Sequence, residues 1–313
     1  MRRKTFYLLS IVDTKDSKLF KPVTQQEVKT FQRDGFVVRE NVLSSTQVDA
    51  ALNSIQRLFK GDYQTGLMPD EVNWRPERDA QDLTRQICNG WKSDPTLAKI
   101  LLDESLGKTC AALMAWPGTR LNQDNIFWKP PGGKALGFHQ DSSYEQWVTP
   151  DDMVSCWIAL DDTQAQGGTV EYVRGSHLWA LEPMIKTFHA PDDPLLEMQQ
   201  AAKRAGVSDP DITAIEVPAG SCVFHHGYTW HGSQTNHLEQ PRRSIVAHCM
   251  SSAARFSDQH TGAVYSRYQR FGDTAMDESF FPILWRNDGY RSTFLDAYLN
   301  QEIGWGGVKP PQR

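Results

Sequence analysis

The sequence predicts a mainly β fold with flanking helices. From about residue 121 onward, short segments rich in β-branched and aromatic residues alternate with Gly, Pro and Asp, which favours an antiparallel β-sandwich or barrel. The first third of the chain instead shows apolar residues at helical spacing. The expected strands of the β-rich part cover residues 121–128, 138–141, 153–160, 168–173, 212–217, 221–226 and 242–250.

The N-terminal third supplies the flanking helices. A first helix is expected to begin after Thr24, a good N-cap, and to end at Gly35, because glycine favours the position after a helix. A strand at 36–38 follows, and a second helix should run from residue 44 or 45 to 59. Residues 60–89 are polar, contain prolines and are expected to be irregular.

The remaining segments complete the predicted domain. An insertion at 178–211 interrupts the strands and carries a helix around 194–205. An aromatic segment, 280–305, is expected to pack on the core or on a neighbouring subunit. We therefore expect one domain over 1–313. It would consist of a helical part at 24–120, a core at 121–250 and a C-terminal helical and aromatic segment at 251–313.

Composition narrows the classes of partner. The chain has 313 residues and a net charge of −5, and its longest basic run, Arg2-Arg3-Lys4, argues against a nucleic-acid or anionic-membrane surface. Five scattered cysteines without a C-x-x-C pair indicate neither a disulfide framework nor a zinc site. The apolar run 6–12 is too short to span a membrane and no cleavage site follows it, so we expect a cytoplasmic protein with a small-molecule partner.

Two segments carry metal-binding chemistry. His139 and Asp141 lie two residues apart on a predicted strand, so both side chains would point to the same face. An H-x-D pattern by itself is weak, but His231 follows a later strand and Arg242 comes eleven residues after it. Two histidines and one carboxylate would leave positions open on Fe(II) for a bidentate 2-oxo acid and for dioxygen. Arg242 would pair with the distal carboxylate of that acid, and Ser244, on the same face, could add a hydroxyl bond.

Other histidines compete for the third ligand position. His225 and His226 are close to His231 in sequence, but they lie at the end of a strand and their spacing to Arg242 fits less well. His248 has no partner pattern and is expected to be a surface or packing residue.

Taken together, these motifs resemble the phytanoyl-CoA dioxygenase family of Fe(II)/2-oxoglutarate-dependent oxygenases. The resemblance spans roughly 24–250, and the order of the motifs is more specific than any one of them. The matching segments are FQRDGFVVRENVLSS, LNQDNIFWKPPGG, GFHQD, CWIALDD, GGTVEYVRGSH and HGSQTN followed by R-R-S.

The resemblance implies a double-stranded β-helix, or jelly-roll, core in a single catalytic domain. Carried over by position, the iron ligands are His139, Asp141 and His231. The 2-oxoglutarate site would use Arg242 and Ser244 as carboxylate anchors, with the neighbouring positions Ser233, Asn125 and Trp157. The presence of Asp141 disfavours halogenation, because the family's halogenases replace this carboxylate with Gly or Ala.

The expected function is a dioxygenase that hydroxylates a C–H bond of a small or medium organic metabolite, such as a natural-product intermediate, and releases succinate and CO2. Its cofactors would be Fe(II), 2-oxoglutarate and O2, with ascorbate as an activator. The candidate substrate residues are Gln140, Tyr144 and Trp147, and the protein would be a monomer or homodimer. Three alternatives stay open: desaturation, epoxidation or rearrangement on the same iron; a catalytically inactive jelly-roll binding or regulatory protein; and a cupin-type isomerase or hydrolase.

Overall fold

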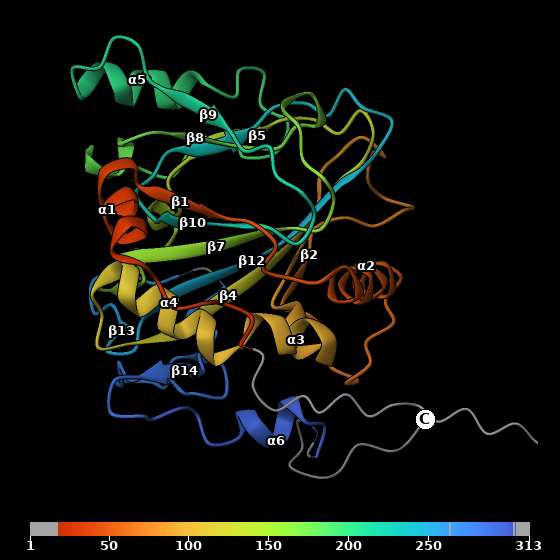
Figure 1. The fold of residues 1–313 in the computed structure, drawn as a ribbon, viewed down its shortest axis with the longest axis vertical. Helices are drawn as coiled ribbons and strands as arrows, with labels where there is room; N and C mark the ends of the chain where they lie inside the picture. Colours follow the sequence, from red (N-terminus) through yellow and green to blue (C-terminus); the bar gives the residue numbers. More distant parts are fainter. Residues whose placement is uncertain (1–17, 263, 303, 305–313) are drawn as a thin grey trace, which may run out of the picture.

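Two antiparallel β-sheets face each other, and helices cover the outer face of the larger sheet (Figure 1). The computed structural model describes residues 18–262, 264–302 and 304, so the apolar run 6–12 and the end of the aromatic segment lie outside it. The large sheet has the strand order β1-β10-β7-β12-β4-β3-β2, and β14 also pairs with β4. The small sheet has the order β5-β11-β8-β9, and β13 pairs with β6.

The elements have the following bounds. The helices are α1 Gln25–Asp34, α2 Ser45–Phe59, α3 Pro95–Leu101, α4 Glu104–Met114, α5 Leu196–Arg204 and α6 Leu295–Leu299. The strands of the large sheet are β1 Phe36–Arg39, β2 Glu71–Val72, β3 Arg85–Cys88, β4 Gly118–Lys129, β7 Met153–Ala159, β10 Cys222–His226, β12 Arg242–Ser251 and β14 Ile283–Arg286. The other strands are β5 Leu136–His139, β6 Val148–Thr149, β8 Val170–Val173, β9 Ile212–Ala214, β11 His231–Ser233 and β13 Arg255–Phe256.

Side-chain alternation divides the large sheet into two faces. Ile158 and Ile245 point to one face, where they pack into a core formed with α1 to α4. Trp157 and Val246 point to the other face and pack against Tyr172 of the small sheet. Because period-2 alternation holds along β7 and β12, every second residue of these strands faces the space between the sheets. That inner face is where the candidate site lies.

The N-terminal helices form where the sequence predicts them. Thr24 and Glu27 make a capping box at the start of α1, and Ser44 caps α2 in the same way with Gln47. Gly35 ends α1 with φ 82°, and a Cβ there would lie 2.5 Å from His177 Nδ1. Glycine is therefore required at this position both for the left-handed backbone and for the close approach of the loop after β8.

Two local expectations differ from the structure. The segment 60–89, expected to be irregular, contains β2 and β3, because β3 finds a partner in β4 that its own short sequence does not indicate. Asp141 does not lie on a strand: β5 ends at His139, and Asp141 begins a 3₁₀ turn. The turn, and not strand alternation, brings this carboxylate beside the histidine.

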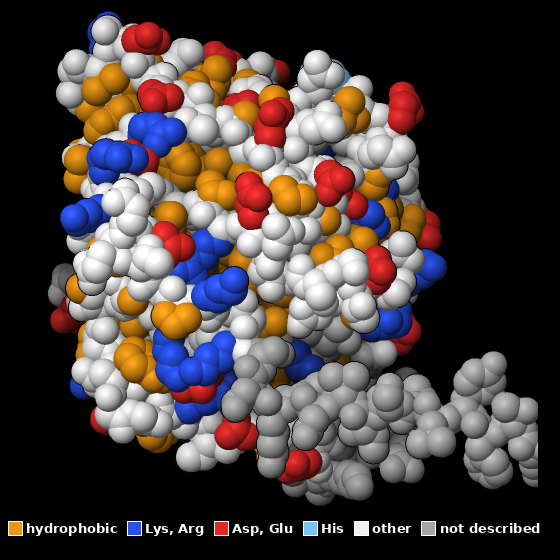
Figure 2. All heavy atoms as spheres, in the orientation of Figure 1, with side chains coloured by type: hydrophobic (Ala, Val, Ile, Leu, Met, Phe, Trp, Pro, Cys, Tyr) orange, Lys and Arg blue, Asp and Glu red, His pale blue; other side chains and the backbone are white. Residues whose placement is uncertain are grey.

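The C-terminal segment packs on the core, which was one of the two positions expected for it. Phe281 packs with Trp147 and Phe256, and Tyr298 of α6 packs on the helical side of the large sheet. No helix among the described residues has the length and apolar character needed to cross a membrane. Lys and Arg side chains are interspersed with Asp and Glu on the face seen in Figure 2, so that face carries both signs of charge.

Candidate metal centre and active site

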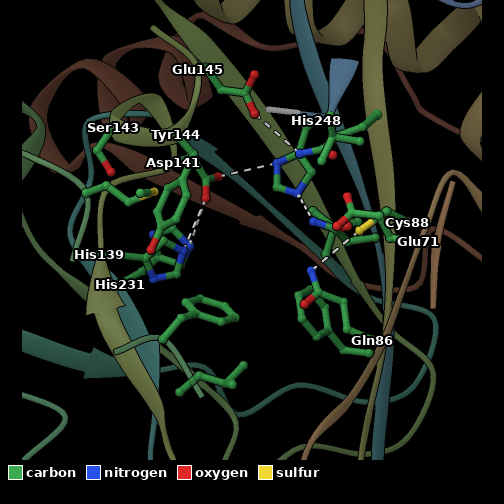
Figure 3. Close-up of a pocket in the computed structure, with 18 of the residues that line it drawn as sticks. Glu71, Gln86, Cys88, His139, Asp141, Ser143, Tyr144, Glu145, His231 and His248 are labelled. Atoms are coloured by element: carbon green, nitrogen blue, oxygen red, sulfur yellow. Dashed lines mark hydrogen bonds and ion pairs between the residues drawn. The ribbon is translucent and has the colours of Figure 1, made fainter. Parts of the chain in front are cut away.

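Three side chains from two adjacent strands and a turn converge between the sheets (Figure 3). His139 ends β5 and His231 begins β11, and the two residues are direct partners in the antiparallel register. Asp141 Oδ1 lies 3.3 Å from His139 Nε2 and 3.5 Å from His231 Nε2. One ligand atom from each residue lies within 4.8 Å of the others, and all three residues are buried. The two nitrogens and one oxygen fit a two-histidine, one-carboxylate metal site.

Backbone carbonyls orient both imidazoles. His139 Nδ1 donates to the carbonyl of Gly137 at 2.9 Å, and His231 Nδ1 donates to the carbonyl of Thr229 at 2.9 Å. In each ring the proton is therefore on Nδ1, and Nε2 keeps its lone pair for a metal. Burial and the neighbouring His139 hold the pKa of His231 well below its usual range, so the ring stays neutral, the form that binds metal.

The second oxygen of Asp141 is held by three other residues. Ser155 Oγ donates to Asp141 Oδ2 at 2.6 Å, His225 Nε2 lies at 3.0 Å, and His248 Nδ1 lies at 3.4 Å. Burial would raise the pKa of Asp141, but the nearby imidazoles of His231 and His248 and the hydrogen bond from His225 hold it well below the usual range. The carboxylate is thus ionised and presents Oδ1 to the imidazole nitrogens.

His225 lies behind the three convergent residues. Its Nδ1 accepts from Tyr172 at 2.9 Å and its Nε2 bonds to Asp141, so both ring nitrogens already have protein partners. His226, the other competitor, lies beside Tyr228, where its Nδ1 accepts from the backbone N–H at 3.0 Å. Neither belongs to the cluster of potential metal ligands among the described residues.

His248 was expected to be a surface or packing residue, and the structure corrects this. It is buried on β12, directly opposite Ser155 of β7, and its Nε2 accepts from Asn125 at 2.9 Å. The signal was present in the sequence: His248 comes six positions after Arg242, and because this offset is even, the two side chains lie on the same face of the strand.

A cavity of about 640 Å³ opens beside the convergent residues. The predicted residues that line it are His139, Asp141, Tyr144, Trp147, Asn125, Trp157, His231, Ser233 and Arg242. Two of these have polar atoms without a partner, Asn125 Oδ1 and Tyr144 Oη. A ligand with hydrogen-bond donors and acceptors can satisfy them.

Arg242 forms a buried cationic end of this cavity. Its Nε and Nη2 both donate to the carbonyl of Gly168 at 3.1 Å, and its Nη1 donates to Ser244 Oγ at 3.2 Å. The guanidinium carbon lies 6.0 Å from the centre of the Trp157 ring. Burial lowers the pKa of Arg242 to about 10, which leaves it charged at neutral pH. Ser244 supports Arg242 and is not among the residues that line the cavity.

Gln140 faces away from the cavity. It is buried, its Nε2 donates to the carbonyls of Tyr228 at 2.9 Å and Ala180 at 3.3 Å, and its Oε1 accepts from the N–H of Glu182 at 2.8 Å. The side chain therefore fastens the start of the insertion to the turn that carries Asp141.

The opposite end of the cavity is rich in acceptors. Glu145 is buried and accepts from Asn122 Nδ2 at 2.8 Å and from Gln123 Nε2 at 3.3 Å. Burial raises its pKa to about 7 in spite of these bonds. Glu71 also lines this end, and among the described lining residues Arg242 supplies the single Lys or Arg side chain. Sequence reasoning missed both glutamates, because nothing local marks them as neighbours.

Several proteins of known name have sequences similar to this one. The sequence is 26% identical over 247 residues to the ectoine dioxygenase of Bordetella parapertussis, covering 74% of this chain and 76% of that protein. It is 23% identical over 268 residues to a phytanoyl-CoA dioxygenase domain-containing protein 1 homolog of Caenorhabditis elegans, covering 74% and 92%.

Solved structures show the same fold. The 2-oxoglutarate-dependent carbocyclase SnoK from nogalamycin biosynthesis superposes with a TM-score of 0.66 and 21% identity, covering 83% of this chain and 96% of that one. EctD from S. alaskensis, solved with 2-oxoglutarate and 5-hydroxyectoine, gives a TM-score of 0.59 and 19% identity, covering 80% and 83%. The two sheets are thus those of a double-stranded β-helix.

The profile of the family "Phytanoyl-CoA dioxygenase (PhyH)" matches residues 31–244, more than half of the chain, and the chain therefore belongs to this family of Fe(II)/2-oxoglutarate dioxygenases.

Proposed function

We propose that this protein hydroxylates a C–H bond of a small or medium-sized organic molecule, using Fe(II), 2-oxoglutarate and O2. One oxygen atom would enter the substrate and the other would enter succinate, with release of CO2. The observation that carries the proposal is the convergence of His139 Nε2, Asp141 Oδ1 and His231 Nε2 on the wall of a cavity whose other end holds Arg242. Family membership supports the same reaction class.

In this proposal the convergent side chains hold the iron, and the buried arginine binds the cosubstrate. When bound, iron with 2-oxoglutarate supplies the oxidising chemistry, and the protein positions the target carbon and keeps water out. Arg242 and Ser233 would bind the distal carboxylate, and Asn125 and Trp157 would flank the cosubstrate. Ascorbate would act as an activator by keeping the iron reduced, and we expect a cytoplasmic monomer or homodimer.

The cavity favours a substrate that donates hydrogen bonds. Glu145 and Glu71 line the end remote from Arg242, and Tyr144 and Phe188 add aromatic surface close to His139. A CoA thioester needs cations for its phosphates, and the described lining residues at this end include none. We therefore infer a neutral or cationic substrate with hydroxyl or amine groups. Desaturation, epoxidation and rearrangement remain alternative outcomes, which analysis of the product distinguishes.

An anaerobic absorbance titration tests the proposal. Fe(II) and then 2-oxoglutarate are added to the metal-free protein, and we expect the visible charge-transfer band of a chelated 2-oxo acid. The band should be lost in His231→Ala, weakened in Arg242→Met, and kept in His237→Ala, a control at an exposed histidine. A folded, iron-loaded protein without any band would favour the binding protein or the cupin-type enzyme.

A further inference from the structure

A buried lysine lies beside Arg242 on the inner face of the large sheet. Lys129 ends β4 and is the direct register partner of Arg242 on β12. It is 0% exposed, although lysine is among the residues least often buried without a partner. Because Asn125 and Lys129 are four residues apart on β4, they share the face that looks toward the small sheet.

The ammonium group of Lys129 is held by two oxygen atoms of the small sheet and the loop after it. Its Nζ donates to Ser233 Oγ at 2.8 Å and to the carbonyl of Gln234. Among the described residues, the hydrogen-bond acceptors of Lys129 and Arg242 are hydroxyl and carbonyl oxygens and not carboxylates. Burial and the nearby Arg242 hold the pKa of Lys129 well below its usual range, while Glu171 opposes this shift. A second positive charge beside Arg242 is therefore unfavourable by itself, and an anion bound next to both side chains would favour the charged form of Lys129.

The bond from Lys129 sets the direction in which Ser233 can donate. A hydroxyl has one proton and two acceptor sites, so an oxygen that accepts from Nζ keeps its own proton for another partner. Ser233 and Arg242 both line the cavity, whereas Lys129 does not. The lysine therefore acts on a bound molecule through Ser233 and through its charge.

We propose that Lys129 is a positioning residue for the distal carboxylate of 2-oxoglutarate. It fixes Ser233 so that the hydroxyl donates into the cavity, and together with Arg242 it selects a dicarboxylic 2-oxo acid over a monocarboxylic one. This inference rests on the proposed function, since it assigns the specificity of the same cosubstrate site.

A purely structural role is the alternative. The stem of Lys129 packs under two glycines: a Cβ at Gly133 would lie 2.7 Å from Lys129 Cγ, and a Cβ at Gly168 would lie 3.0 Å from Lys129 Cδ. A lysine that only filled this space would support the site equally for any 2-oxo acid. Methionine retains the length and the packing of the stem without the charge, so it separates the two roles.

The test compares two chelating acids on Fe(II)-loaded, anaerobic protein. The charge-transfer band is titrated with 2-oxoglutarate and with pyruvate, which chelates iron in the same way but has no distal carboxylate. In Lys129→Met we expect the dissociation constant of 2-oxoglutarate to rise roughly 10- to 100-fold, the loss typical of a bond to a charged group, while that of pyruvate changes less than about twofold. For Lys129→Gln, which retains an N–H donor, the dissociation constant of 2-oxoglutarate should lie between those of the wild type and Lys129→Met.

A control variant and two possible results test the role given to Lys129. Lys134→Met, at an exposed lysine that pairs with Asp82 at 3.2 Å, should change neither constant. Equal weakening of the binding of both acids in Lys129→Met would show a structural role. Unchanged binding of both acids would show that Lys129 does not act on this site. Either result overturns the inference. If Lys129→Met does not fold, the same two titrations on Lys129→Gln decide. Absence of the band in the wild type would instead contradict the proposed function.

Discussion

Ser155 Oγ donates a 2.6 Å hydrogen bond to Asp141 Oδ2, the carboxylate oxygen turned away from the two imidazole nitrogens. His248 Nδ1 lies 2.7 Å from the same hydroxyl. Because the serine proton goes to the carboxylate, the imidazole N–H donates to the serine oxygen. The chain Asn125, His248, Ser155, Asp141 therefore fixes the plane of the carboxylate before any metal binds.

Loss of the serine hydroxyl should weaken iron binding without unfolding the protein. In Ser155→Ala, Asp141 Oδ2 loses its shortest bond, and we expect the Fe(II) dissociation constant to rise roughly 10- to 100-fold, as for other residues that support metal ligands. Competition with a chelator measures this. The control is Ser105→Ala on α4, which removes a buried hydroxyl that accepts from the Phe20 N–H and should lower stability alone. An unchanged iron affinity in Ser155→Ala would contradict the role given to this bond.

Replacement of His231 and His225 should distinguish a metal ligand from a residue that only supports a ligand. His231→Ala removes an Nε2 from the convergent set and should abolish stoichiometric Fe(II) binding. His225→Ala removes one bond to Asp141 Oδ2 and should weaken binding without abolishing it. Iron content after desalting measures both. The opposite order, with His225 essential and His231 dispensable, would transfer the ligand role to His225.

Glu145 should make stability depend on pH. Burial raises its folded pKa to about 7 from an ordinary 4.5, so the folded protein holds a proton that the unfolded chain releases. Its contribution is therefore fully present below pH 4.5 and is lost as the pH rises through about 7. Glu145→Gln removes this dependence, and its unfolding free energy relative to wild type should rise by roughly 2–3 kcal/mol between pH 5 and 8.

Denaturant unfolding of the metal-free proteins at several pH values measures this difference. Asp124, another buried carboxyl whose pKa burial raises to about 7, is present in both proteins, so the comparison isolates Glu145. Parallel stability curves for the two proteins would show that Glu145 does not change its protonation in this range.

Gln140 should matter for stability and not for metal binding. Gln140→Ala leaves the carbonyl of Tyr228 and the N–H of Glu182 without their partner, which should lower the unfolding free energy by roughly 1–3 kcal/mol. Gln199→Ala, at an exposed position of α5 in the same insertion, should change it by less than about 0.5 kcal/mol. A large loss of iron affinity in Gln140→Ala, with stability unchanged, would instead show that this side chain has a role in the active site.

Local patterns predicted those parts of the fold that short stretches of sequence encode. The helix from Thr24 to Gly35 follows from a cap, a spacing and a stop signal within twelve residues. The long strand β12 follows from its β-branched and aliphatic composition. The short strand β3 has too few residues to show a pattern, and β11 lies in a segment whose glycine and polar residues indicate a turn. Both become strands because β4 and β5 supply their hydrogen-bond partners.

The sequence by itself determined the family, the β-rich fold class and the identity of His139, Asp141, His231 and Arg242 as the chemical groups to examine. Their motifs are local and keep a fixed order along the chain. Only the tertiary structure decided which groups support them: Ser155 and His248 are 93 residues apart, and Lys129 and Ser233 are 104 residues apart. Such contacts arise from strand order and register, which are set by the burial of whole sheet faces and not by neighbouring residues.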